Sequence, residues 1–245
     1  IAYPNLRVRM FGFLPGITTP GGVSHQAIDD IAVLRGVPNM TILEVGDATD
    51  IESMLDVAHA VDGPVYVRML RKEVPRLFPA SAAMKLDTAR VVREGDDVTV
   101  ITSGICTEEA MRAAAALEAR GVSVEHLHIT TLKPFSDERV AEACARAKYG
   151  VVTLENHTTI GGLGSCVAEL MAERGVENRL TRLGLFDTYA HGASREYLMK
   201  EYRLDAVSLV EAIGGLVGER LDVSEEELAE VRLSDFTGEG QLEAL

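Results

Sequence analysis

Asp97-Val-Thr-Val-Ile-Thr-Ser103 is an unbroken run of β-branched and apolar residues, which indicates a strand buried on both faces. A helix is expected next, because Thr107 suits an N-cap and an alanine-rich stretch runs from there to a stop at Gly121. Residues 122–129 then alternate like a second strand. Strands alternating with helices in this way predict a parallel sheet covered by helices.

The same alternation continues downstream and defines a second domain that we expect over residues 86–220. Strands are expected at 150–154 and 180–185, and helices at 136–147, after Gly164, at 195–202 and at 205–213. Residues 221–245 are acidic and poorly patterned, which predicts a surface helix or a partly ordered tail.

Residues 1–85 repeat this pattern and form the expected first domain. Strands are expected at 6–10, 40–45 and 64–69, and helices at 24–35 and 49–61. Residues 70–95 are the expected crossover between the domains. Three strands are few for an independent α/β domain, so we expect this one to lack its front part. The predicted fold is therefore α/β, with two domains whose mainly parallel sheets are covered by helices.

Composition restricts the class of protein. The net charge of −14 over 245 residues argues against a nucleic-acid partner, and the densest basic stretch, Arg68–Arg76, is too short for one. No apolar run reaches the roughly 18 residues of a membrane span, and no secretion signal is visible. Cys106, Cys144 and Cys166 match no disulfide or zinc spacing, so we expect buried thiols in a reducing cytoplasm.

Two stretches carry residues suited to chemistry at the carboxyl edge of a sheet. The glycine-rich loop Gly12–Gly22 leads to His25, beside an expected strand end where α/β sheets bind ligands. The alternative is a capping turn with an incidental surface histidine. Arg68 and Arg71 follow another strand, where a guanidinium can bind a phosphate. The alternative is a run of solvated surface charges.

A third stretch, Glu155-Asn-His157 followed by the glycine cluster 160–165, resembles a phosphate-binding loop. It is not G-x-G-x-x-G, so we favour a tight structural turn. His126 and His128 share one strand face without a nearby third ligand, which favours structural roles.

Taken together, these motifs resemble the transketolase family. Residues 24–35, which begin Ser-His-Gln, and Val37-Pro-Asn-Met40 are similar to its pyrimidine-binding domain. Thr102-Ser-Gly104, Leu132-Lys-Pro-Phe135 and 155–165 are similar to its C-terminal domain. The resemblance extends over roughly residues 1–215. Pyruvate dehydrogenase β-chains and deoxyxylulose-phosphate synthases share the architecture, but the His-Gln, arginine and Pro-Asn-Met combination fits transketolases better.

The resemblance implies the small, C-terminal-type subunit of a split transketolase, which moves two-carbon ketol units between sugar phosphates. It implies thiamine diphosphate as cofactor, with Mg²⁺ bound mainly by a diphosphate-binding partner subunit, and a heterotetramer with a two-fold axis. His25 matches the catalytic histidine that contacts substrate oxygen, and Arg71 matches the arginine that binds the substrate phosphate, with Arg68 as the next candidate. The activating glutamate and the aromatic residues that stack on the pyrimidine are expected upstream of Ile1, so no cofactor-binding or metal residue is assigned in this chain.

Two departures from the family pattern concern the sugar. Leu14 stands where the family usually has a second histidine, and Pro20-Gly-Gly22 replaces an acidic residue. Both missing groups normally contact sugar hydroxyls, so we expect a modified or branched sugar. A related thiamine enzyme, making deoxyxylulose phosphate or transferring an acyl group, and a non-catalytic scaffolding relative remain open alternatives.

Overall fold

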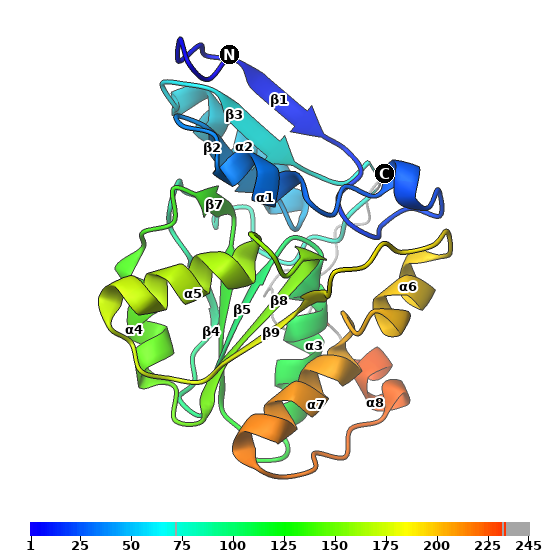
Figure 1. The fold of residues 1–245 in the computed structure, drawn as a ribbon. Helices are drawn as coiled ribbons and strands as arrows, with labels where there is room; N and C mark the ends of the chain where they lie inside the picture. The colour runs from blue at the N-terminus through cyan, green and yellow to red at the C-terminus, as the bar shows by residue number, and fades with distance from the viewer. Residues whose placement is uncertain (72, 232, 234–245) are drawn as a thin grey trace.

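Two β-sheets, stacked end to end, organise the chain (Figure 1). The computed structural model describes residues 1–71, 73–231 and 233. In the first sheet the order is β1 (Arg9–Gly12), β3 (Val65–Arg68), β2 (Thr41–Glu44) and β7 (Thr131–Lys133). In the second it is β4 (Arg90–Arg93), β6 (Val124–Ile129), β5 (Val98–Ser103), β8 (Gly150–Thr158) and β9 (Leu180–Leu185). Only the β2–β7 and β4–β6 pairings are antiparallel among the described strands, so the predicted α/β class with mainly parallel sheets is confirmed.

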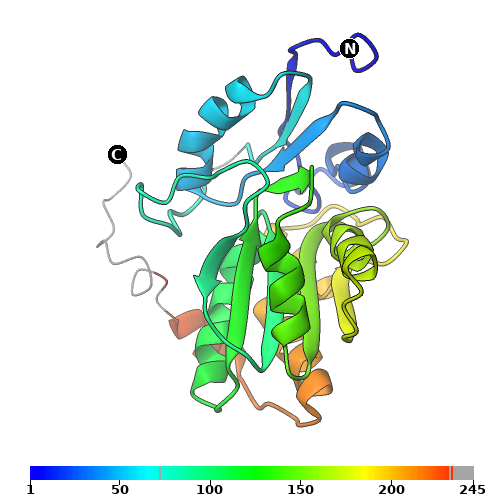
Figure 2. The same ribbon diagram turned by 90° about the vertical axis from the view of Figure 1, so that its left-hand side faces the viewer.

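Helices cover both sheets. They are α1 (Asp30–Arg35), α2 (Ala48–Ala60), α3 (Cys106–Glu118), α4 (Glu138–Arg146), α5 (Leu163–Arg174), α6 (Arg195–Glu201), α7 (Ala206–Val217) and α8 (Glu225–Glu230). On the second sheet, α3 and α7 pack on one face, and α4 and α5 pack on the other (Figures 1 and 2). A sheet covered on both faces needs strands that are apolar on both sides, which explains the composition of β5 and β8. None of the helices in the described ranges combines the length and apolarity that a membrane span requires.

One buried apolar cluster spans both sheets. β7 follows the second sheet's β6 along the chain but pairs with β2 in the first sheet. Ile31 and Ile42 of the first unit belong to the same buried cluster as Leu132 and Leu163 of the second. The domain limits 1–85 and 86–220 therefore remain a prediction, because buried contacts cross them.

The structure differs from the sequence predictions in several details. The helix expected at 24–35 is a 3-10 turn, Val23–His25, followed by non-helical residues and then by α1 from Asp30. β7 was not predicted, and neither was β4, which lies within the crossover expected at 70–95. Thr107 is not an N-cap, because α3 begins at Cys106 and contains it. Helix α2 begins at Ala48, one residue before its expected start, and is capped by Asp47, whose carboxylate accepts the N–H of Asp50 at 2.8 Å.

The acidic tail is described in part. Helix α8 begins after Ser224, whose side chain accepts the N–H of Glu227. The prediction for residues 232 and 234–245 falls outside the described residues.

Candidate functional site

The carboxyl ends of three parallel strands meet at one edge of the first sheet. Gly12, Arg68 and Glu44 end β1, β3 and β2 in register with one another. The chain leaves β1 into the glycine-rich loop that ends at His25, and it leaves β3 towards Arg71. Because β1 and β3 are neighbours, the two loops that carry the predicted site residues leave the sheet side by side.

His25 is exposed and closes the 3-10 turn. Its ring Nδ1 lies 2.8 Å from Ser24 Oγ, which engages one ring nitrogen and leaves Nε2 for another partner. Gly21 packs against it: a Cβ at Gly21 would lie 2.9 Å from His25 Cβ and 2.9 Å from Cγ. The ring therefore packs against a glycine and is oriented by a serine hydroxyl.

Arg71 is also exposed, in a segment that is anchored at both ends. Met69 N–H donates to the carbonyl oxygen of Gly12 at 2.9 Å. Beyond Arg71, the Asp47 carboxylate accepts the N–H groups of Leu77 at 2.9 Å and Phe78 at 3.0 Å. The structure records no ion pair for Arg71 with any residue it describes. An exposed cation without an ion-pair partner among the described residues suits an external anion.

Arg68 lies in a different environment, with a side chain only 1% exposed. Its guanidinium forms an ion pair with Glu44 and another with Asp30 at 3.0 Å. Its Nη2 donates to the carbonyl oxygens of Ala27 and Asn156, each at 2.8 Å. All three guanidinium nitrogens are used inside the chain, so none is left for a substrate phosphate, in contrast to the expectation for Arg68.

The buried ions fix one another's protonation. Burial alone would raise the pKa of the Asp30 carboxyl, but the charge of Arg68 and a hydrogen bond from Tyr66 hold it below the ordinary value. Burial alone would lower the pKa of Arg68, but the Glu44 and Asp30 charges raise it. This cluster joins β2, β3 and α1 beneath the exposed edge.

The second unit supports the loop that carries His25. Asn156, in β8, accepts the N–H of Ile17 at 2.9 Å and donates to the carbonyl oxygen of Pro15 at 3.2 Å. Gly16, with φ +53°, lies so close that a Cβ there would be 2.1 Å from Asn156 Oδ1. No local sequence signal assigns Asn156 this role, since its partners lie about 140 residues away along the chain.

The contacts of Glu155 show whether the glycine cluster 160–165 is a phosphate-binding loop or a structural turn. Its carboxylate accepts the N–H groups of Leu163 at 2.6 Å and Gly164 at 2.9 Å, at the start of α5. Those N–H groups are the ones a phosphate would need, so the prediction of a structural turn is confirmed. The structural roles of His126 and His128 are confirmed too, because both are buried and bonded to threonine hydroxyls.

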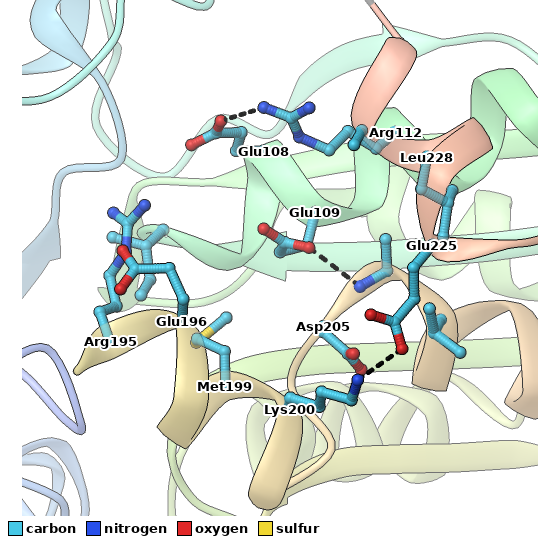
Figure 3. Close-up of a pocket in the computed structure, with 14 residues that line it drawn as sticks. Glu108, Glu109, Arg112, Arg195, Glu196, Met199, Lys200, Asp205, Glu225 and Leu228 are labelled. Carbon is cyan, nitrogen blue, oxygen red and sulfur yellow. Dashed lines mark hydrogen bonds and ion pairs between the residues drawn. The ribbon is translucent and has the colours of Figure 1, made fainter. Parts of the chain in front are cut away.

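A separate hollow of about 340 Å³ lies among α3, α6, α7 and α8 (Figure 3). Charged side chains that line the hollow form ion pairs with one another: Arg112 with Glu108 at 2.6 Å, and Lys200 with Glu225 at 2.5 Å. Glu109 accepts the N–H of Ala206 at 2.9 Å. Across the part of the chain that the structure describes, no cluster of His, Cys, Asp and Glu could hold a metal ion.

Comparison with known proteins agrees with this architecture. The family described as "Transketolase, pyrimidine binding domain" matches residues 1–76, and "Transketolase, C-terminal domain" matches residues 87–209. A 6-deoxy-6-sulfo-D-fructose transketolase subunit of Clostridium sp. is 36% identical over 213 residues, which are 86% of this chain and 66% of that protein. One of the apulose-4-phosphate transketolase subunits of Actinobacillus succinogenes is 32% identical over 213 residues, which are 86% of this chain and 68% of that protein.

A solved structure described as a split gene transketolase, in the form of an inactive beta4 tetramer, has a TM-score of 0.81 and 33% identity. The match covers 90% of this chain and 70% of that one. The chain spans about two thirds of the length of each of these two sequence relatives. Both family domains are present in the expected order, and they extend over most of the chain: it belongs to the transketolase family, as a C-terminal-type subunit.

Proposed function

We propose that the chain is the small subunit of a thiamine-diphosphate-dependent transketolase that transfers a two-carbon ketol unit between sugar phosphates. The observation that carries the proposal is the carboxyl edge of the first sheet. There an oriented, exposed imidazole, His25, and an exposed guanidinium, Arg71, leave two neighbouring strands in a transketolase-family chain.

His25 acts on substrate oxygen. Because Ser24 engages Nδ1, Nε2 is the nitrogen that faces a ligand, and it can donate a hydrogen bond to a hydroxyl or carbonyl oxygen or exchange a proton with it. The exposed side chains of Phe13 and Val23, 48% and 54% accessible, lie in the same loop. Covering them would exclude water from the site and strengthen that hydrogen bond.

Arg71 binds the far end of the substrate. A guanidinium matches the geometry of a phosphate group through two parallel N–H donors. The nearest anchored residues that the structure describes are Met69, whose N–H donates to Gly12, and Leu77, whose N–H donates to the Asp47 carboxylate.

The cofactor of this family supplies the carbanion chemistry of ketol transfer, and protein groups position and polarise the substrate. The groups that this chain offers at the edge fit the substrate side: an imidazole for oxygen and a cation for phosphate. We assign the diphosphate and Mg²⁺ to the partner subunit. The beta4 tetramer of the structural neighbour and the subunit names of the relatives support a multi-subunit assembly, which for this chain and its partner we propose is a heterotetramer.

The sugar is proposed to differ from xylulose 5-phosphate. Leu14 and Gly21 present no side-chain hydrogen-bonding group, so neither side chain can recognise a hydroxyl. A site with fewer such groups rejects unusual sugars less strongly. The two relatives whose names carry sugars, a sulfo-fructose and apulose 4-phosphate, support this choice.

A donor panel tests the proposal. The chain, assembled with its diphosphate-binding partner, thiamine diphosphate and Mg²⁺, is assayed with xylulose 5-phosphate, with branched and sulfonated ketoses, and with pyruvate. We expect a ketose other than xylulose 5-phosphate to give the highest kcat/KM. Pyruvate as the best donor would favour the synthase or acyl-transfer alternative, and no turnover with any donor would favour a scaffold.

A further inference from the structure

Two loops from different units lie side by side (Figure 1). One is residues 13–26, which leave β1, and the other is residues 186–194, which connect β9 to α6. The side-chain amide of Gln26 joins them: its Nε2 donates to the carbonyl oxygens of Thr19 and His191, each at 3.3 Å. Because Gln26 is only 7% exposed, both bonds are shielded from water.

Glycines allow the loops to come this close. A Cβ on Gly192 would lie 2.5 Å from the carbonyl oxygen of Pro20, closer than any side chain tolerates. Facing it, Gly22 has φ +67°, and a Cβ there would lie 3.4 Å from the backbone nitrogen of Gly192. The contact is therefore backbone against backbone, and the amide of Gln26 bonds across it.

The same turn sets the position of His25. His25 N–H donates to the carbonyl oxygen of Gly22 at 2.9 Å, and its ring rests on Gly21. Apart from Ser24, the ring has no hydrogen-bond partner within the described residues. Its placement thus depends on the backbone between Gly21 and Gln26, which is the part held against the second unit.

We propose that Gln26 is a positioning residue for His25, and that it acts by tying the His25 loop to the His191–Gly192 segment of the second unit. The inference rests on the proposed role of His25. A displacement of about 1 Å in a reacting group costs on the order of a hundredfold in rate, so loosening this tie lowers turnover without touching the substrate.

Two variants loosen the tie in different ways. Gln26→Met keeps the length of the side chain and removes both donors. Gly192→Ala leaves Gln26 intact and forces the loops apart through its Cβ. The matched control is Asn178→Leu, because the Asn178 amide also donates to two carbonyl oxygens, those of Cys144 at 2.8 Å and Ala147 at 2.7 Å. Asn178 lies before β9, at the amino end of the second sheet, away from His25.

The first measurement is hydrogen–deuterium exchange of residues 13–26 in the purified chain. The second is kcat and KM of the assembled enzyme with the best donor of the panel. We expect both loop variants to exchange faster in this segment and to lose about ten- to a hundredfold in kcat with little change in KM, whereas Asn178→Leu changes neither.

Unchanged exchange in Gln26→Met and Gly192→Ala would overturn the inference, as would faster exchange with unaltered kcat, or an equal loss of kcat in Asn178→Leu. A wild-type assembly without ketol transfer would refute the proposed function instead. In that case the exchange measurement alone decides the tie: unchanged exchange overturns it, and faster exchange in both variants supports it.

Discussion

His25 and Arg71 are the residues on which the proposed chemistry depends, and both are exposed on loops that follow neighbouring strands. We expect His25→Ala to lower kcat by about 10²-fold or more, because it removes a hydrogen bond that strengthens in the transition state. His59→Ala is the control, since His59 is exposed on α2. Steady-state kinetics of the assembled enzymes give the answer, and equal activity of the two variants would remove His25 from the mechanism.

Arg71 and Arg68 separate substrate binding from stability. Arg71→Ala is expected to raise KM for phosphorylated sugars, with a loss of about 1.5 to 3 kcal/mol of binding free energy and no change in stability. Arg68→Met leaves the Glu44 and Asp30 carboxylates without their buried partner, so we expect about 3–5 kcal/mol lower free energy of unfolding. Kinetics and urea denaturation check the pair. The assignment of Arg71 is wrong if unphosphorylated donors suffer as much as phosphorylated ones.

Sequence patterns could not distinguish these two arginines. They stand three positions apart in one basic stretch, and each is a plausible phosphate ligand on residue type alone. What separates them is the pairing of β3 with β2, which brings Glu44 beside Arg68, and the packing of α1, which brings Asp30. Such partners are set by tertiary structure and carry no local signal.

Helices and strands were predicted well where their signals were local. The strands β5 and β9 and the helix α5 lie close to their expected places, because apolar runs and glycine boundaries mark them. The first part of the helix expected at 24–35 is not helical, because its backbone bonds to residues that are distant in the sequence. Ala27 pairs with Pro15 and Ile28 accepts the N–H of Thr158 at 2.8 Å, so this backbone bonds to other elements instead of to itself.

Buried titrating groups in β6 and β8 predict how stability depends on pH. Burial lowers the pKa of His126 from 6.5 to about 3, and burial with the nearby charge of Arg68 lowers that of His157 from 6.5 to about 4. Burial raises the pKa of Glu155 from 4.5 to about 8, against the two N–H groups that it accepts. The histidines thus bind fewer protons in the folded state than in the unfolded state, and Glu155 binds more.

The direction in which stability changes with pH follows from the difference in bound protons between the folded and unfolded states. Below pH 6.5 the unfolded state takes up two histidine protons that the folded state does not, while Glu155 offsets one of them down to pH 4.5. Between pH 6.5 and 4.5 stability therefore falls on acidification by about 1.4 kcal/mol per pH unit, and it falls more steeply just below pH 4.5. Stability also falls as the pH rises from 6.5 to 8, because folded Glu155 keeps a proton that the unfolded state has released. Urea denaturation across this range should give a maximum near pH 6.5. Stability that keeps rising up to pH 8 would show that Glu155 is already ionised at neutral pH.

At the scale of the whole molecule, the two units are held together by β7, by a shared apolar core and by the tie at Gln26. Two successive domains, and the family to which they belong, could be predicted from the residues alone. The completion of the first sheet by a strand of the second unit could not, because a three-residue strand has too few side chains to show a period.

The central claim is that this chain completes a ketol-transferring enzyme only together with a diphosphate-binding partner. Ketol transfer from the best donor to an aldose phosphate is measured for the chain alone, the partner alone and the mixture, each with thiamine diphosphate and Mg²⁺. We expect activity in the mixture only, and its loss when His25→Ala replaces the wild-type chain. Full activity of the isolated chain, or a mixture in which the wild type does no better than the partner alone, would contradict the account.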